Sequence, residues 1–360
     1  MNSDVASSPY APNVLPRDDS KHQSQRQQAL RLLRRHGWNA TSFQILQDHF
    51  KYWFSGHRAC VAYVDTGKAW VVAGSPVANS DCLDIVAREF VSYARQNRRR
   101  VVFFGTESRF VQSVGFTSIA VGNQTTFDAR DWLSSVNRRL SLREQLRRAR
   151  AKGVRVERLF PSQMAQSWIP LQLDIDTLIA RWLAEKRLPP LGFLATIQPF
   201  SFMQERLYFV ARQAEAIVGF SAMVPVYERQ GWLLENLVRA PEAPNGTTDT
   251  LIDCAMREAA KTGSGFLTLG LAPLAGDIGF WLTLAKRLGM SLYNFAGIEQ
   301  FRAKFQPSDC CPIYISFPHD QSAPLAIYDT LVAFAQVGLV RFGIRVLLRQ
   351  MRSVCGKRPT

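Results

Sequence analysis

The chain has 360 residues, of which 47% are hydrophobic and 20% are charged, and it contains 23 phenylalanines and 8 tryptophans. This composition excludes a disordered chain, and the length allows two domains that each have a core. The formal net charge of +15 and the isoelectric point near 9.9 favour polyanionic partners, such as tRNA or an anionic lipid surface. The alternative is a generally basic protein in which arginine replaces lysine.

Other broad features exclude several kinds of site. No uncharged apolar run of about 20 residues occurs, so we expect no membrane-spanning helix. The histidines lie outside the core of the second half, so no Ser-His-Asp or Cys-His set is expected there. The cysteines show no metal-binding spacing, and we predict buried, reduced thiols throughout, no metal and no cofactor. They are Cys60, Cys82, Cys254, Cys310, Cys311 and Cys355.

The chain begins with a polar segment and then becomes structured. Residues 1–27 are rich in Ser, Pro and Gln and are predicted to be disordered, without the apolar core of a signal peptide. Residues 28–135 are predicted to form a first domain. It contains a helix ended by Gly37, strands at 59–65 and 69–77, a helix at 84–97 and a strand at 98–107. We expect it to be structural or to form a binding surface, because Pro76 makes its Gly-Ser-Pro turn a poor phosphate cradle.

A basic linker helix is predicted over residues 136–153. Arg139, Arg143, Arg147 and Arg150 recur at helical spacing, so they share one face. This face could contact the phosphates of tRNA or of lipid. The alternative is a solvated linker whose charges only keep the protein in solution.

The second domain, predicted over residues 154–318, carries the most informative segment, Leu233 to Leu274. It holds a strand, an Asn-Gly loop that opens a helix, a second strand and a Gly-Leu-Ala-Pro-Leu exit. This order resembles the acyl-binding half of a Gcn5-related N-acyltransferase fold. In that fold a glycine-rich loop presents backbone N–H groups to the pyrophosphate of coenzyme A. Here the loop keeps one glycine and contains Pro244, which argues against an ordinary coenzyme A donor.

Four short motifs carry a more specific resemblance. LVRAPEAPNGTTDTLID, TLGLAPLAG, FRAKFQP and PIYI resemble the C-terminal catalytic domain of the aminoacyl-phosphatidylglycerol synthases, also called the lysylphosphatidylglycerol synthetase or multiple peptide resistance factor family. The resemblance covers roughly residues 28–316, in a stand-alone form without the flippase membrane region. It implies an α/β (α+β) fold of tandem Gcn5-related N-acyltransferase-like domains, with mixed sheets flanked by helices.

The same resemblance implies an activity: transfer of an amino acid from aminoacyl-tRNA to a lipid headgroup similar to phosphatidylglycerol. The chain departs from the family pattern at three places. Asn236 stands where the family has an acidic residue, Arg302 replaces a lysine, and Ser308-Asp309 replaces a tryptophan. These departures leave the particular amino acid and lipid open.

Transfer from an activated ester needs positioned reactants, a proton acceptor and stabilisation of an oxyanion. We therefore expect catalytic roles for Glu235, Asn236, Arg239 and Asp249. Arg239 matches the family and could hold a phosphate or carboxylate at two points. The alternatives are an exposed strand edge for Glu235 and a helix-dipole contact for Asp249.

Six further residues are expected to bind substrate. Asn245 and Gly246 would supply backbone donors at the helix start, although a plain turn is the alternative. Gly270 and Pro273 would let the sheet splay open, although packing alone could require them. Arg302 and Lys304 could clamp a phosphate, as the resemblance implies, or form a surface pair of charges.

The C-terminal segment 323–355 is predicted to be a basic amphipathic helix. Arg341, Phe342, Arg345 and Arg349 would contact an anionic membrane surface. The alternative is that the helix docks back onto the domains. We expect a cytoplasmic protein that associates peripherally with the inner face of the cytoplasmic membrane.

Three functions follow from the sequence. The first is an aminoacyltransferase that uses aminoacyl-tRNA and a membrane lipid. The second is an acyltransferase that uses acyl-carrier protein or acyl-coenzyme A and acts on a lipid or an amine. The third is a non-catalytic protein that binds tRNA or lipid.

Overall fold

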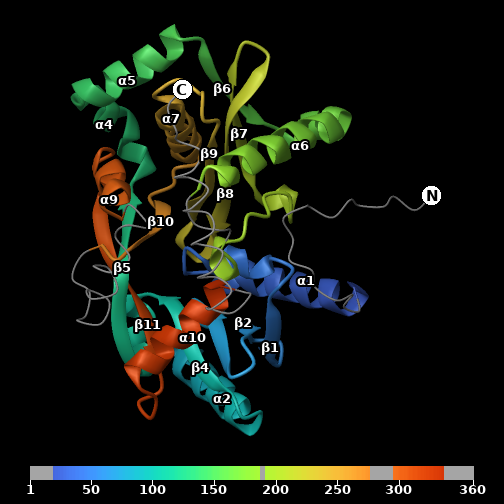
Figure 1. Cartoon of the computed structure of the whole chain (residues 1–360). Coiled ribbons are helices and arrows are strands. Elements are labelled where there is room, and N and C mark those ends of the chain that lie inside the picture. Colours follow the sequence, from blue (N-terminus) through green and yellow to red (C-terminus); the bar gives the residue numbers. More distant parts are fainter. Residues whose placement is uncertain (1–18, 187–190, 276–294, 336–360) are drawn as a thin grey trace, which may run out of the picture.

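A computed structural model describes residues 19–186, 191–275 and 295–335 of the chain (Figure 1). The strands are β1 (Lys51–Ser55), β2 (Ala59–Asp65), β3 (Ala69–Ala73), β4 (Arg100–Thr106), β5 (Thr117–Phe127), β6 (Val154–Leu159), β7 (Leu207–Gln213), β8 (Ala216–Val226), β9 (Gly231–Arg239), β10 (Leu267–Pro273) and β11 (Asp309–Phe317). The helices are α1 (Asp19–His36), α2 (Leu83–Gln96), α3 (Ser108–Val114), α4 (Trp132–Arg138), α5 (Leu140–Ala151), α6 (Pro161–Ala184), α7 (Thr247–Lys261), α9 (Phe295–Ala303) and α10 (Ala323–Ala335).

The strands form one mixed sheet of eleven strands, in the order β1-β2-β3-β4-β11-β5-β10-β9-β8-β7-β6. The same arrangement occurs twice along it. In each half, antiparallel strands lead into a helix and then into a strand parallel to the last one: β3, α2 and β4 in the first half, and β9, α7 and β10 in the second. The predicted α/β (α+β) fold with a tandem arrangement and flanking helices is therefore confirmed.

The two halves exchange strands at the centre of the sheet. Strand β11, from the end of the second half, lies between β4 and β5 of the first half. Strand β5 in turn separates β11 from β10. Because each half contributes a strand inside the other, backbone hydrogen bonds run without a break from β1 to β6.

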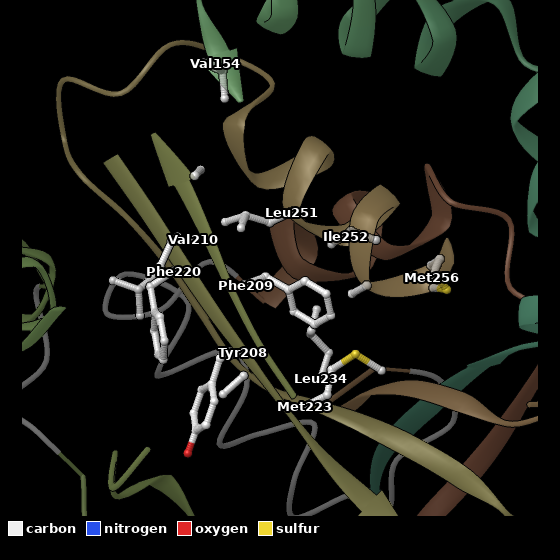
Figure 2. Close-up of a cluster of buried hydrophobic side chains, with 14 of the residues drawn as sticks. Val154, Tyr208, Phe209, Val210, Phe220, Met223, Leu234, Leu251, Ile252 and Met256 are labelled. Carbon is white, nitrogen blue, oxygen red and sulfur yellow. The ribbon is translucent and has the colours of Figure 1, made fainter. Parts of the chain in front are cut away.

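Regular burial patterns explain why these segments fold as they do. In α2 the buried positions recur at helical spacing (Leu83, Val86, Ala87, Phe90, Val91 and Ala94), and these residues pack against β2, β3 and β4. The predicted helix at 84–97 and strand at 59–65 are confirmed. In the second half the same pattern places Leu251, Ile252 and Met256 of α7 against Phe209, Met223 and Leu234 (Figure 2).

Two element boundaries differ from the sequence-based expectation. Helix α1 begins at Asp19, inside the segment 1–27 that composition predicts to be disordered. Its Arg26 is buried, donates to the Leu46 carbonyl at 2.7 Å and pairs with Asp48 at 2.5 Å, so tertiary contacts order this polar stretch. The basic linker is two helices, since α4 ends at Arg138 and α5 begins at Leu140.

The structure bears on the predicted absence of a membrane-spanning helix and on the start of the predicted C-terminal helix. Within the described residues, no helix is both long and apolar enough to span a membrane. The predicted membrane contacts at Arg341, Phe342, Arg345 and Arg349 lie outside the described residues. Helix α10 is the described beginning of the predicted helix over 323–355.

Candidate functional site

Strands β9 and β10 run parallel but separate soon after they start. In the described part of the chain they pair only at Trp232–Leu267 and Leu233–Thr268. Beyond that point β10 continues beside β5, and β9 continues beside β8 as far as Arg239. The sheet therefore opens between the two strands, where the sequence predicted a splay. In an acyltransferase-like fold this is where the acyl donor would enter.

Arg302 of α9 binds the part of β10 that lies beyond its pairing with β9. Its guanidinium donates to the carbonyls of Leu269, Gly270 and Leu271 at 2.7, 2.6 and 3.0 Å. Gly270 has a positive φ of 78°, which favours glycine where β10 departs from regular pairing. Arg302 thus stabilises β10 at the point where β9 has left it. The predicted roles of Gly270 and Pro273 in binding substrate stay predictions.

Glu235 lies on a bulge in β9. The register between β8 and β9 shifts between Ala222 and Met223, so Glu235 is an extra residue on its strand. Its carboxylate forms an ion pair with Arg206, and the two side chains are 2% and 1% exposed. Arg206 also donates to the Ser201 carbonyl at 2.7 Å. The alternative of an exposed edge position for Glu235 is therefore wrong.

The bulge places two consecutive polar residues on the same side of the sheet. Tyr208, Ala222 and Asn236 form one cross-strand row, so they share a face. Burial raises the pKa of Tyr208, and the nearby charge of Glu235 raises it further, which places Glu235 beside the same row. Glu235 and Asn236 therefore point toward the Tyr208 face.

Both side chains carry an unused acceptor. Glu235 Oε1 and Asn236 Oδ1 are buried and have no hydrogen-bond partner among the residues that the structure describes. Asn236 as a whole is 6% exposed. A buried acceptor without a donor is costly by about 1–3 kcal/mol. The pair is therefore suited to a ligand that brings N–H or O–H donors.

Arg239 lies at the end of β9, opposite Gly219. It forms no ion pair with the described parts of the chain. Its charge helps to lower the pKa of Lys186, which follows α6, although desolvation is the larger cause of this shift. Two cations therefore lie near one another at this end of β9, in an arrangement suited to an anionic group.

The loop that opens α7 is covered by α5. Gly246 has a φ of 96°, and a Cβ atom there would lie 3.0 Å from both Ala149 Cβ and the Gln145 carbonyl oxygen. The glycine is thus required by a left-handed backbone and by the contact with the basic linker. Asn245 precedes it in the same turn. The phosphate-binding role expected for these two residues stays a prediction.

Two other predicted site residues meet at the start of α7. Asp249 is buried and forms an ion pair with Lys304, which follows α9. Lys304 and Arg302 therefore have different protein partners, and their predicted role as a phosphate clamp stays a prediction. Asp249 in the first turn also suits the helix dipole. Its catalytic role stays a prediction.

The basic face of α5 is divided between protein contacts and solvent. Arg139 bonds the Phe305 carbonyl and Gln306, and Arg150 pairs with Asp253 at 3.3 Å. Arg143 and Arg147 are exposed, and Arg147 pairs with Glu144 at 2.9 Å. Arg143 and Arg147 are therefore the members of the predicted stripe best placed for an external phosphate.

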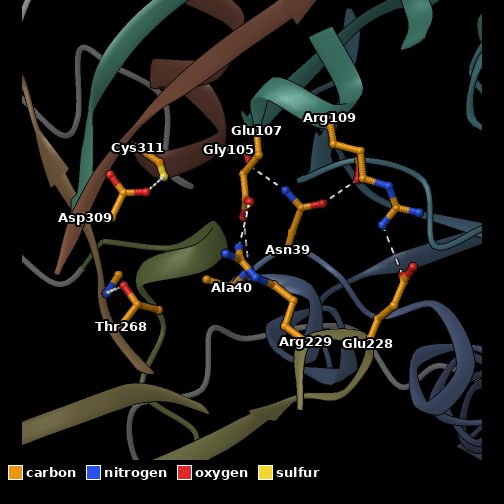
Figure 3. Close-up of polar contacts among 12 residues, drawn as sticks. Asn39, Ala40, Gly105, Glu107, Arg109, Glu228, Arg229, Thr268, Asp309 and Cys311 are labelled. Carbon is orange, nitrogen blue, oxygen red and sulfur yellow. Dashed lines mark hydrogen bonds and ion pairs between the residues drawn. The ribbon is translucent and has the colours of Figure 1, made fainter. Parts of the chain in front are cut away.

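Sequence reasoning missed a charged contact between the two halves, which Figure 3 shows. Glu107, directly after β4, accepts from Arg229 at 3.1 Å, and the Arg229 guanidinium lies 3.5 Å from the ring centre of Phe266. Burial raises the pKa of Glu107, although Arg229 opposes this shift. Arg206 was missed as well. No local sequence pattern marks the pair of Glu107 with Arg229 or the pair of Glu235 with Arg206, because the partners are far apart in sequence.

The described residues contain no group of three or more His, Cys, Asp or Glu side chains that could hold a metal ion. Burial raises the pKa of Cys60 to about 12 and that of Cys311 to about 11, so both favour the thiol form. Cys310 is exposed, which differs from the expectation of buried thiols throughout.

Comparisons with known proteins agree with this geometry. The chain is 24% identical over 286 residues to a phosphatidylglycerol lysyltransferase of Bacillus subtilis, covering 75% of this chain and 32% of that protein. It is 23% identical over 312 residues to an uncharacterized protein of Corynebacterium glutamicum, covering 80% of this chain and 38% of that protein. The chain thus spans about a third of the length of the curated relatives it matches.

Solved structures share the fold. The C-terminal domain of a putative lysylphosphatidylglycerol synthetase from Agrobacterium fabrum superposes with a TM-score of 0.74 at 21% identity, covering 87% of this chain and 98% of that one. The L-PGS structure from Bacillus licheniformis gives 0.71 at 20% identity, covering 90% and 99%. The family model described as phosphatidylglycerol lysyltransferase, C-terminal, matches residues 30–317, and the chain belongs to this family.

Proposed function

We propose that this protein is an aminoacyltransferase that moves an amino acid from aminoacyl-tRNA to the headgroup of a membrane lipid such as phosphatidylglycerol. The reaction would take place at the cytoplasmic leaflet of the membrane. Membership of the phosphatidylglycerol lysyltransferase family supports this reaction class. The buried polar groups beside the opening between β9 and β10 support an aminoacyl group as the group that is transferred.

One observation carries the proposal. Beside the opening lie two buried acceptor oxygens, Glu235 Oε1 and Asn236 Oδ1, that have no partner within the described residues. An aminoacyl group carries an ammonium with three donors, which would satisfy both acceptors. An acetyl or fatty acyl group has no such donor and would leave both oxygens unsatisfied. The site therefore favours an aminoacyl donor over an ordinary acyl donor.

The start of α7 supports a donor other than coenzyme A. A coenzyme A pyrophosphate would need bare N–H groups at this helix start. Here Gly246 is in contact with Ala149 and Gln145 of α5. Helix α5 instead carries the exposed Arg143 and Arg147 close to the same helix start, and these cations suit the phosphates of a tRNA acceptor end.

The chemistry needs no covalent enzyme intermediate. A lipid hydroxyl would attack the carbonyl carbon of the aminoacyl ester and form the new ester bond. The bond to the tRNA ribose then breaks, and the hydroxyl proton ends on the released ribose oxygen. In this proposal Glu235 relays the proton and Arg239, at the end of β9, holds the lipid phosphate. Positioning of the two substrates would supply much of the rate enhancement.

The proposal is tested by supplying purified protein with vesicles of phosphatidylglycerol and a mixture of aminoacyl-tRNAs. We expect a lipid product that contains one amino acid, and no product with acetyl- or palmitoyl-coenzyme A. Glu235→Gln and Arg239→Ala should abolish the product while thermal unfolding shows a folded protein. Glu157→Gln, which removes an exposed carboxylate that pairs with Arg212, is the matched control and should retain activity. Turnover of Arg239→Ala at the wild-type rate would overturn the site assignment.

A further inference from the structure

Helix α10 has a solvent-facing side without charge. Its exposed residues are Pro324, Tyr328 and Leu331, which recur at i, i+4 and i+7 and so lie on one face. Tyr328 and Leu331 are each 50% exposed. The sole charged residue of the helix, Asp329, is buried on the other side. Exposed helix faces of water-soluble proteins normally carry charged residues, as Arg88, Glu89 and Arg95 do on α2.

The inner side of α10 is firmly attached to the sheet. Asp329 accepts two hydrogen bonds from Arg100 of β4, at 2.8 and 2.7 Å. Phe334 packs edge-to-face against Phe104 and Phe193, with ring centres 5.1 Å apart in both pairs. The Phe334 carbonyl also accepts from the Gly192 amide at 2.9 Å. These contacts fix the position of α10, which lies across the part of the sheet that contains β4 and β11 (Figure 1).

A cationic turn lies at the edge of this helix. Arg100, which reaches Asp329, follows Arg98 and Arg99, and its amide bonds the Lys68 carbonyl at 3.2 Å. Arg98 and Lys68 are exposed and form no ion pair with the described parts of the chain. The nearby acids Asp65 and Asp320 are already paired with other cations. An apolar face flanked by uncompensated cations is complementary to an anionic lipid bilayer.

The chain that follows α10 has the same character. Residues 336–360 contain arginines and lysine but no aspartate or glutamate. A partner protein with an apolar surface would gain little from this excess of positive charge, whereas an anionic membrane attracts it. The charge pattern thus selects a lipid surface over a protein partner.

We infer that the outer face of α10 is a membrane-docking surface, with Tyr328 and Leu331 in the lipid interface and Lys68 and Arg98 facing anionic headgroups. Tyrosine is typical of this depth, because its ring is apolar and its hydroxyl can remain hydrated. The inference deepens the proposed function by naming the surface that brings the enzyme to its lipid. It is tested by measuring binding of the protein to lipid vesicles, which does not require aminoacyl transfer.

The test compares two pairs of exposed apolar residues in the full-length chain. One variant carries Tyr328→Glu and Leu331→Glu on α10. The matched control carries Ile169→Glu and Leu173→Glu on α6, where the side chains are 80% and 66% exposed. Binding is measured by sedimentation with vesicles of 30% phosphatidylglycerol and 70% phosphatidylcholine. We expect the α10 variant to bind at least tenfold more weakly than wild type and the α6 variant to bind within twofold of it.

Several outcomes would overturn the inference. Equal losses in both variants would mean that any added negative charge weakens binding. Unchanged binding of the α10 variant would place the docking surface elsewhere. A changed oligomeric state or a lowered unfolding temperature of the α10 variant without vesicles would show that residues 336–360 or a second copy of the chain covers this face.

A second arm separates this inference from the proposed function. Lys68→Ala with Arg98→Ala should weaken binding to anionic vesicles by roughly an order of magnitude and leave binding to neutral vesicles unchanged. With phosphatidylglycerol dissolved in detergent, the α10 variant should transfer the amino acid as fast as wild type. Absence of transfer by the wild type, together with vesicle binding that depends on α10, would refute the function and leave the docking surface intact.

Discussion

Arg206 and Glu235 form an ion pair that is almost completely buried beside the opening between β9 and β10, and Glu235 Oε1 has no protein partner in the part of the chain that the structure describes. The cation holds one carboxylate oxygen and leaves the other available. A carboxylate fixed in this way can accept a hydrogen bond from a substrate ammonium without first losing an intramolecular bond.

Removing either partner of this ion pair should have different consequences. Arg206→Leu leaves Glu235 buried without its cation, and we expect a loss of about 3–5 kcal/mol in the free energy of unfolding. Glu235→Gln keeps the shape and loses the charge, so it should unfold closer to wild type but lose transfer activity. Urea unfolding of both variants measures the difference. Equal stability of Arg206→Leu and wild type would contradict the role of the buried pair.

The contact between α5 and the start of α7 predicts a second stability effect. Gly246→Ala introduces a Cβ atom 3.0 Å from Ala149 Cβ and from the Gln145 carbonyl, at a φ of 96°. Gly263→Ala is the matched control, because its φ is 69° and no atom lies within 4 Å of the added carbon. We expect about 1–2 kcal/mol of destabilisation from the backbone in both, and about 1–3 kcal/mol more from overpacking in Gly246→Ala. Thermal unfolding that shows equal losses would refute the close contact.

The exposed cations of α5 should govern the affinity for tRNA. Arg143→Gln with Arg147→Gln removes two positive charges that lie on the surface. The salt dependence of tRNA binding should weaken accordingly, by roughly 0.7–0.9 in slope for each phosphate that the variant no longer neutralises. Arg58→Gln, an exposed cation between β1 and β2, is the control and should not change the slope. Filter binding at several salt concentrations measures the slope, and an unchanged value in the double variant would remove α5 from the tRNA-binding surface.

The contact between the halves at Glu107 predicts a dependence of stability on pH. Burial raises the pKa of Glu107 above the ordinary value of about 4.3. The folded state then binds the proton more tightly than the unfolded state, so this group costs stability as the pH rises from the ordinary pKa through the raised one. The free energy of unfolding of Glu107→Gln should therefore rise relative to that of wild type as the pH increases across this window. Above the window the difference between the two proteins should stay constant. Asp128, whose pKa is lowered chiefly by its hydrogen bond with Arg130, provides the control. Asp128→Asn should show the opposite slope.

The sequence predicted the elements whose burial is periodic. The strand at 59–65 and the helix near 84–97 are predictable because apolar residues recur at intervals of two and of three to four. This pattern depends on nothing outside the segment. The splay at β10 was also predicted, because Gly270 and Pro273 restrict the backbone locally.

The remaining features depend on contacts that are distant in sequence. The insertion of β11 between β4 and β5 joins residues about 200 positions apart, and no local pattern specifies it. An Asn-Gly turn before a helix is typical of a phosphate cradle, so the sequence predicts this role for Gly246, whereas its nearest neighbours in the structure belong to α5. Alternation along a strand allows an exposed edge position for Glu235, because it cannot reveal a bulge or the buried Arg206 that pairs with this residue.

We infer that an amino acid is transferred to a lipid at the opening between β9 and β10. The most direct measurement is mass spectrometry of lipids extracted from cells that express the wild-type chain, Glu235→Gln or no copy of it. We predict a lipid that is heavier than a cellular phospholipid by one amino-acid residue, present with the wild type and absent in the other two strains. A mass increase equal to a fatty acyl group, or no change in a strain that contains the folded protein, would contradict the account.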